Sequence, residues 1–252
     1  MFRVRLAYFD KSPKKAMRGK NWFRIIISVS AIVLVAAGLP PLASAESGID
    51  SHVKMATRIN GEISIIPDEK IAAAIAQLPH NTKQTASKRK LIPQLIDFNQ
   101  WVDCFGLNSE NAVFAEYVHW WDGAGQDVRL KCGTNNYGYK HIRSGTNGNN
   151  GKEQLWQNDL NYARQAGWNS QAQGIESWDD LMAASIGSTV TWPDYRAVNS
   201  ISKKTCGVAE IIFVNTETGK IVWTFKNLSI WSNDSDRLIT SYPQGRLNCY
   251  PS

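Results

Sequence analysis

The chain has 252 residues, of which 43% are hydrophobic, 10% aromatic and 20% charged, and its formal net charge is +6. This length suits one hydrophobic core with a small appendage, and the aromatic content excludes a collagen-like, coiled-coil or wholly disordered chain. Residues 1–45 hold eight basic side chains and one acidic side chain, which gives them +7 and leaves residues 46–252 at −1. The overall basic charge therefore gives no evidence of a nucleic-acid partner.

Residues 1–45 have the pattern of a Sec signal peptide. A basic stretch ends at Arg24, an uncharged apolar run follows over 25–38, and 43–45 offers the small residues that a signal peptidase accepts. The apolar run is shorter than the roughly 20 residues that span a membrane, so an uncleaved anchor is the weaker alternative. The long basic leader resembles signals of Gram-positive secreted proteins. We expect a secreted or cell-wall-associated protein with no stable membrane span after signal cleavage.

Residues 46–90 are predicted to form an N-terminal extension. Their pattern predicts a short strand over 62–66, a helix over 67–78 that begins with proline and two acidic residues, and a polar basic linker over 80–90. The secreted domain is therefore expected over 91–252.

Helices are predicted early in this domain. Apolar residues at helical spacing predict one helix over 91–104 and another over 155–167. A third helix begins at Ser177, where the run Ser-Trp-Asp-Asp resembles a capping box, and extends to Gly187. The segment 112–121 is compatible with either a strand or a helix.

The last third of the chain has the patterns of strands. Strands are predicted over 127–131, 190–192, 209–214, 221–230 and 237–242. The turn over 215–220 is rich in residues that tolerate unusual backbone angles, so its flanking strands are expected to form a hairpin. Helices followed by an antiparallel meander predict an α+β fold, with N-terminal helices and a C-terminal sheet.

Four cysteines are present: Cys104, Cys132, Cys206 and Cys249. An even number in an exported protein predicts two disulfides, and no pair has the C-x-x-C spacing of a zinc ribbon. Of the three possible connectivities we favour Cys104–Cys132 with Cys206–Cys249, because each bridge closes a local loop. Each bridge is expected to stabilise the fold by roughly 2–4 kcal/mol.

The sequence lacks the common motifs of metal and nucleotide enzymes: H-E-x-x-H, the P-loop, G-x-G-x-x-G and G-x-S-x-G. Its four histidines, His52, His80, His119 and His141, are not spaced as metal ligands. We therefore expect neither a cofactor nor a metal.

One segment, YGYKHIRSG over 137–145, gathers Lys140, His141 and Arg143 beside a glycine turn. Metal-free cleavage of RNA needs a base for the ribose 2′-hydroxyl, an acid for the leaving oxygen and cations for the phosphate. Histidine suits proton transfer near neutral pH, and Lys and Arg remain charged. A surface turn with incidental basic residues is the alternative interpretation.

This segment, the later run AEIIFVNTETGKIVWTF and the terminal LITSYP resemble the barnase–EndoU–colicin–RelE-like toxin nucleases over about residues 138–243. The resemblance implies a metal-independent endoribonuclease that leaves a 2′,3′-cyclic phosphate, with RNA as substrate and an immunity or cell-envelope protein as a further partner. It implies His141 as the acid–base residue, Lys140 and Arg143 as phosphate ligands, and Thr240 and Tyr242 facing the scissile group.

The sequence departs from this family at one position. Many such domains carry a second histidine shortly after the first, and residues 144–151 supply none. The second proton-transfer group would then be His119, Tyr242 or Lys226, or the domain is a relative without activity.

The tryptophan content supports a different class of function. The chain has 10 tryptophans, and flat indole rings stack on sugars as well as on nucleobases. The alternative function is therefore a non-catalytic secreted protein that binds glycan or a protein partner through aromatic residues. Core packing also explains most tryptophans; Trp223 and Trp231, an even number of residues apart on one predicted strand, are expected on one sheet face.

Overall fold

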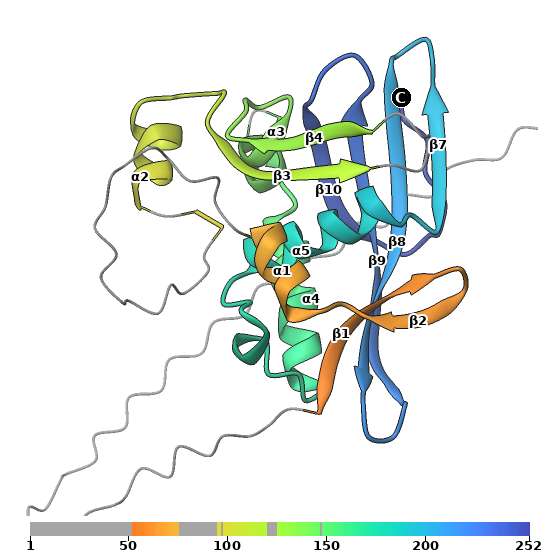
Figure 1. The fold of residues 1–252 in the computed structure, drawn as a ribbon. Helices are drawn as coiled ribbons and strands as arrows, with labels where there is room; N and C mark the ends of the chain where they lie inside the picture. Colours follow the sequence, from red (N-terminus) through yellow and green to blue (C-terminus); the bar gives the residue numbers. More distant parts are fainter. Residues whose placement is uncertain (1–51, 76–94, 97, 120–124, 147) are drawn as a thin grey trace, which may run out of the picture. The chain divides into compact units, whose positions relative to one another are not determined.

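Long antiparallel strands dominate the structure, a computed structural model shown in Figure 1. It describes residues 52–75, 95–96, 98–119, 125–146 and 148–252. The strands are β1 (Val53–Ile59), β2 (Glu62–Ile65), β3 (Val113–His119), β4 (Gln126–Lys131), β5 (Gly145–Thr146), β6 (Asn149–Asn150), β7 (Tyr195–Asn199), β8 (Lys204–Asn215), β9 (Ile221–Ser232) and β10 (Leu238–Gln244). The helices are α1 (Asp68–Ile75), α2 (Phe98–Trp101), α3 (Gly138–Ser144), α4 (Glu153–Gln165) and α5 (Trp178–Thr191), with a π-helical turn (Val102–Gly106) and a 3-10 turn (Gln171–Gln173). The predicted signal peptide and basic linker lie outside the described residues.

The main antiparallel sheet has the strand order β10-β9-β8-β1-β2, and β7 pairs with the first part of β8. The hairpin between β8 and β9 forms as the sequence predicts. Asn215 Oδ1 accepts hydrogen bonds from the backbone N–H groups of Glu217 (3.1 Å) and Thr218 (2.9 Å), and Gly219 has a φ of +67°. These turn residues set the register of the two longest strands.

Helices α4 and α5 pack against this sheet and enclose the core with it (Figure 1). Trp156 of α4 is fully buried, its ring lies edge-on to Phe225 of β9 with 5.8 Å between centroids, and its indole N–H donates to the Ser241 carbonyl (3.2 Å). Trp231 is also fully buried, and Trp223 packs against the same core. Most of the apolar surface of α5 is inside the molecule, which makes it the central helix.

The capping box at Ser177 forms as the sequence indicates. The Asp180 N–H donates to Ser177 Oγ (3.5 Å), and the Ser177 N–H donates to Asp180 Oδ2 (3.0 Å). Asp180 is fully buried, and its other oxygen accepts the Leu95 N–H (2.8 Å). The helix extends through Thr191, so residues 190–191, expected to be in a strand, are helical because the apolar run continues the buried face of α5.

Residues 53–75 belong to the sheet and its helical layer, which differs from the expected N-terminal extension. Strand β1 lies between β8 and β2, with Met55 and Ala56 fully buried, and α1 packs against α5. The Met55 N–H donates to the Gln173 side-chain oxygen (2.9 Å). One partner of β1, strand β8, lies far along the chain. The other, β2, follows the Asn60–Gly61 turn, a local hairpin signal that the prediction overlooked.

The α+β class and both predicted disulfides are confirmed, namely Cys104–Cys132 and Cys206–Cys249. The order of elements differs from the prediction, because α3, α4 and α5 follow the β3–β4 hairpin and the sheet begins before the first helix. The ambiguous segment 112–121 contains strand β3. Among the residues described, no helix has the length and apolar character needed to cross a membrane.

Asp159, on α4, is a carboxyl group whose burial raises its pKa to about 6. Because this value lies above the ordinary 3.8, ionisation of Asp159 opposes folding. The contribution of Asp159 to the unfolding free energy is therefore most favourable below pH 4 and is lost as the pH rises through 6. We expect Asp159→Asn to increase the unfolding free energy at pH 8 by about 1–2 kcal/mol and to change it little at pH 4. Urea denaturation at both pH values measures this, and an unchanged stability at pH 8 would contradict it.

Candidate functional site

Two glycines define the turn that leads into α3. Gly133 and Gly138 have φ values of +69° and +78°, in the left-handed region that favours glycine. A Cβ at Gly138 would lie 2.6 Å from the Lys131 carbonyl oxygen, and one at Gly133 would lie 2.0 Å from the Tyr137 carbonyl oxygen. The turn therefore brings Tyr137 back against the end of β4, and the Lys140 N–H donates to the Cys132 carbonyl (3.0 Å). This turn fixes where the predicted catalytic segment begins.

Replacing Gly138 with alanine is expected to strain this turn. The new Cβ would meet backbone atoms on both sides, and the positive φ adds a conformational penalty. We expect Gly138→Ala to lower the unfolding free energy by about 2 kcal/mol or more. Gly61→Ala, at a turn with a φ of +85° and no atom within 4 Å of the added Cβ, is the matched control and should cost less. Equal losses in denaturant titrations of the two variants would contradict the steric argument.

His141 lies on α3 and is partly exposed. Its Nδ1 lies 2.7 Å from the Asn135 carbonyl oxygen. A carbonyl only accepts hydrogen bonds, so Nδ1 carries the proton in the neutral ring and Nε2 holds the free lone pair. Among the residues described, Nε2 has no hydrogen-bond partner. The ring is therefore oriented by the turn and presents a basic nitrogen.

Lys140 and Arg143 occupy another side of α3. Their charged groups both lie over the Phe105 ring, 5.7 Å and 5.5 Å from its centroid. Lys140 Nζ also donates to Asn108 Oδ1 (2.5 Å), and Arg143 Nε donates to Glu153 Oε2 (3.2 Å). Successive helical residues are rotated by about 100°, which places Lys140 and Arg143 about 60° apart and His141 about 100° from Lys140. Lys140 and Arg143 therefore contact the Phe105 ring and do not surround the His141 imidazole.

Thr240 and Tyr242 lie on β10, against which α3 packs. Ser241, between them, has its hydroxyl group in a buried network with Ser229 (3.0 Å) and Asn227 (2.9 Å) on the side of the sheet that α5 covers. Side chains alternate along a strand, so Thr240 and Tyr242 face the opposite side. Thr240 is buried, and Tyr242 is partly exposed.

Lys152 connects α3 with Tyr242. Its backbone N–H donates to the Ile142 carbonyl (2.6 Å), and its ammonium group lies 4.9 Å from the centroid of the Tyr242 ring. Arg237, just before β10, lies with its guanidinium 5.1 Å from the centroid of the Tyr137 ring, at the start of α3. Sequence reasoning missed both cations. Lys152 was visible only as the residue after the glycine-rich segment 146–151, and nothing in the sequence linked Arg237 to Tyr137.

The other two candidates for the second proton-transfer group lie elsewhere. His119 is fully buried on β3, with Nε2 3.1 Å from Gln126 Oε1. Lys226 lies on β9 opposite Glu210 and Gln244 in the ladder. Tyr242 is therefore the candidate on an element that packs against α3.

A salt-bridge cluster holds the turn before β10. Arg129 Nη1 and Lys131 Nζ contact the two oxygens of Asp236 at 2.9 Å and 2.8 Å, and Arg129 also pairs with Glu116 (2.5 Å). Partial burial alone would raise the pKa of Asp236, but the hydrogen bonds from Lys131 and Arg129 lower it below its usual range. This cluster ties β4 to the residue that precedes Arg237.

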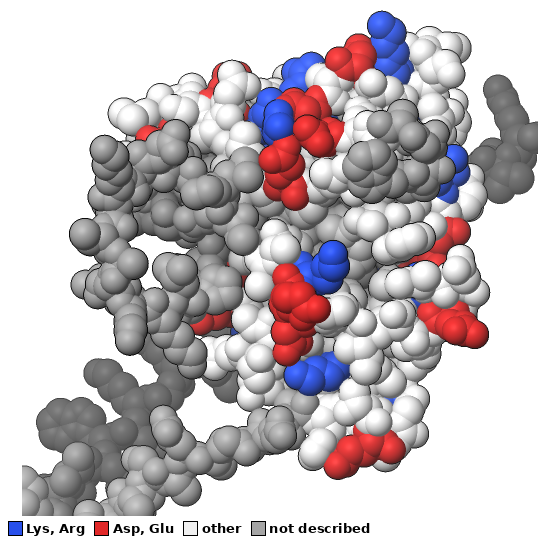
Figure 2. Space-filling view, in the orientation of Figure 1, with Lys and Arg blue, Asp and Glu red and all other residues white. Residues whose placement is uncertain are grey.

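Charge is not concentrated on the face that Figure 2 shows. Acidic and basic side chains are interspersed there with uncharged surface. A polyanion would therefore meet local cations on this face rather than one continuous basic area. The described residues also contain no group of three or more His, Cys, Asp or Glu side chains arranged to hold a metal ion.

The fold and site together define an α+β protein with two disulfides and an oriented surface histidine. No family model, curated protein or solved structure matches this chain.

Proposed function

We propose that the protein is a secreted, metal-independent endoribonuclease in which His141 is the general base. The observation that carries this proposal is the 2.7 Å contact between His141 Nδ1 and the Asn135 carbonyl. This contact keeps the proton on Nδ1, so that Nε2 can accept a proton. In many catalytic histidines a backbone carbonyl or a carboxylate fixes the tautomer in this way. The two disulfides are compatible with an oxidising compartment, which supports export.

The reaction follows from this tautomer. His141 Nε2 takes the proton of the ribose 2′-hydroxyl, and the 2′-oxygen forms a bond to phosphorus. The bond from phosphorus to the 5′-oxygen breaks, and a donor gives that oxygen a proton. The products are a 2′,3′-cyclic phosphate and a 5′-hydroxyl. Tyr242 is the proposed donor, and the Lys152 ammonium above its ring would compensate the negative charge that the phenol oxygen gains.

Arg237 and Lys152 are the proposed phosphate-binding cations. Arg237 lies on the Tyr137 ring at the start of α3 and Lys152 on the Tyr242 ring of β10, and neither cation has a carboxylate partner among the described residues. Arg143, in contrast, is paired with Glu153. Positive groups beside the phosphate stabilise the additional charge of the transition state.

An experiment with two oligonucleotides tests the proposal. Purified oxidised protein in EDTA is incubated with a mixed-sequence RNA and with DNA of the same sequence. We expect cleavage of the RNA alone, because DNA lacks the attacking 2′-hydroxyl. Cleavage of both strands, or RNA cleavage that EDTA abolishes, would exclude the proposed chemistry.

A further inference from the structure

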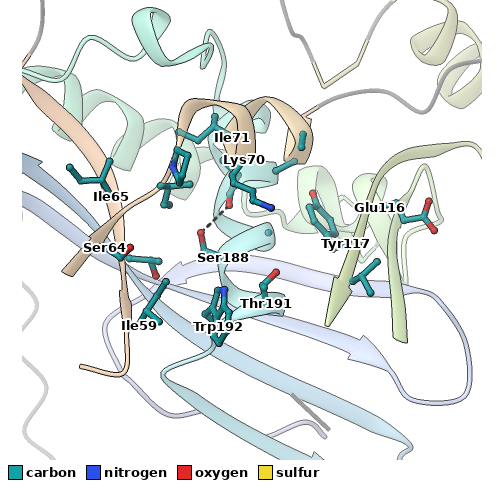
Figure 3. A pocket seen from close by; sticks show the side chains of 18 residues that line it. Ile59, Ser64, Ile65, Lys70, Ile71, Glu116, Tyr117, Ser188, Thr191 and Trp192 are labelled. Atoms are coloured by element: carbon teal, nitrogen blue, oxygen red, sulfur yellow. Dashed lines mark hydrogen bonds between the residues drawn. The ribbon is translucent and has the colours of Figure 1, made fainter. Parts of the chain in front are cut away.

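Two adjoining hollows lie at the β1–β2 edge of the molecule. The larger, of about 480 Å³, lies between α1, α5, β3 and the β1–β2 hairpin and is lined mainly by apolar side chains such as Ile65 and Ile71 (Figure 3). The smaller, of about 360 Å³, is lined by polar groups that include Arg58 and Asp194. Both volumes lie in the range of small-molecule sites. In the strand order, this edge is at the opposite end of the sheet from β10.

Trp192 lines both hollows. It follows the last residue of α5, where its backbone N–H donates to the Ser188 carbonyl (2.8 Å), and its side chain is 52% exposed. An exposed indole with a fixed backbone is a flat apolar surface at the junction of an apolar and a polar hollow. Sugar rings have an apolar face that stacks on such a surface.

Tyr117, on β3, lines the larger hollow and has an unsatisfied polar atom. The residue is 5% exposed, and its hydroxyl group has no hydrogen-bond partner among the residues that the structure describes. Burial raises the pKa of this phenol, so the group is a neutral hydroxyl that can donate. A buried polar group without a partner costs roughly 1–3 kcal/mol, and a ligand acceptor would remove that cost.

Charged residues beside the smaller hollow form an ion pair and a hydrogen bond with each other. Arg58 Nε lies 2.6 Å from Glu210 Oε2, and Asp194 Oδ2 accepts the Glu210 N–H (2.7 Å). The formal charges of two arginines, Arg58 and Arg196, and two carboxylates, Asp194 and Glu210, cancel in this region, which leaves no net charge to attract an ion. A neutral ligand with several hydroxyl groups fits these alternating donors and acceptors.

We propose that the two hollows form one binding site for an N-acetylated amino sugar of a glycan chain. The pyranose ring lies on Trp192, and its hydroxyl groups face Arg58 and Asp194. The acetamido methyl group enters the apolar hollow, where the acetamido carbonyl accepts a hydrogen bond from Tyr117. This site does not depend on the proposed ribonuclease activity, and it would hold the protein on a glycan surface while the β10 edge stays open.

Titration with two tetrasaccharides tests this site. Tetra-N-acetylchitotetraose is compared with cellotetraose, which has the same linkage and hydroxyl groups in place of the acetamido groups. In isothermal titration calorimetry we expect saturable binding of the first and at least about tenfold weaker binding of the second. No saturable binding of the acetylated sugar, or equal affinity for both, would overturn the proposal.

Three variants locate the site. Trp192→Ala should weaken binding by about tenfold or more, and Tyr117→Phe, which keeps the ring, by about 2- to 10-fold, the value of one hydrogen bond. Trp101→Ala is the matched control, because Trp101 is similarly exposed (49%) but lines neither hollow. Circular dichroism verifies that each variant is folded. Unchanged binding by folded Trp192→Ala would overturn the proposal, and RNA cleavage by that variant should equal that of the wild type.

Discussion

Replacing His141 with alanine is expected to slow RNA cleavage by about 10²- to 10⁴-fold, the range that general acid–base groups contribute. The variant loses Nε2, the only atom that the account assigns to proton abstraction. The side chain is partly exposed, so its removal should change the unfolding free energy by less than about 1 kcal/mol. The measurement is kcat/KM on a fluorogenic RNA, with urea denaturation of the same preparation.

His52→Ala is the matched control for this prediction. His52 is also exposed, and its Nδ1 lies 3.2 Å from Glu217 Oε1, far along the chain from α3. Its removal should leave kcat/KM unchanged. Equal activity of the wild type and His141→Ala, or equal losses in both variants, would contradict the role of His141.

Removing the Cys104–Cys132 bridge is expected to lower the unfolding free energy by about 3–4 kcal/mol. The two half-cystines are 28 residues apart, and the bridge restricts that loop in the unfolded chain. The bridge also lies directly before the turn that orients His141, because Cys132 accepts the Lys140 N–H (3.0 Å). The double variant Cys104→Ala/Cys132→Ala should therefore lose RNA cleavage as well as stability.

Denaturant titrations of the double variant and the oxidised wild type measure this loss. Cys206→Ala/Cys249→Ala is the comparison, since that bridge closes a loop of 43 residues but joins β8 to the C-terminal segment. It should cost a similar free energy and affect cleavage less. If both double variants lose the same amount of cleavage for each kcal/mol of lost unfolding free energy, stability alone controls activity, and the role of the turn is contradicted.

Local signals in the sequence predicted much of the fold. The capping residues Ser177 and Asp180 and the turn at Asn215 act within short stretches of chain, and each formed the predicted structure. The four cysteines formed the two predicted bridges, because an even number of cysteines leaves few possible pairings. Strand β1 was missed although the Asn60–Gly61 turn that joins it to β2 is a local hairpin signal, and its pairing with β8 depends on a contact far along the chain. Propensity is a weak guide wherever long-range pairing decides the conformation.

The candidate sites were predictable only in part. His141 stood out by residue type, but the role of the Asn135 carbonyl depends on how Gly133 and Gly138 close the turn. No sequence pattern indicated the hollow at Trp192, because the residues that line it come from four separate parts of the fold. The positions of Lys140 and Arg143 over Phe105 depend on helix rotation and on a ring supplied by another segment.

The chemical identity of the cleaved RNA ends shows whether the ribose 2′-hydroxyl is the attacking group. Mass spectrometry of the fragments made by the purified protein in EDTA distinguishes the possible ends. We expect 5′ fragments that end in a 2′,3′-cyclic phosphate and 3′ fragments that begin with a 5′-hydroxyl. Intact RNA, or fragments with 5′-phosphate and 3′-hydroxyl ends, would contradict it.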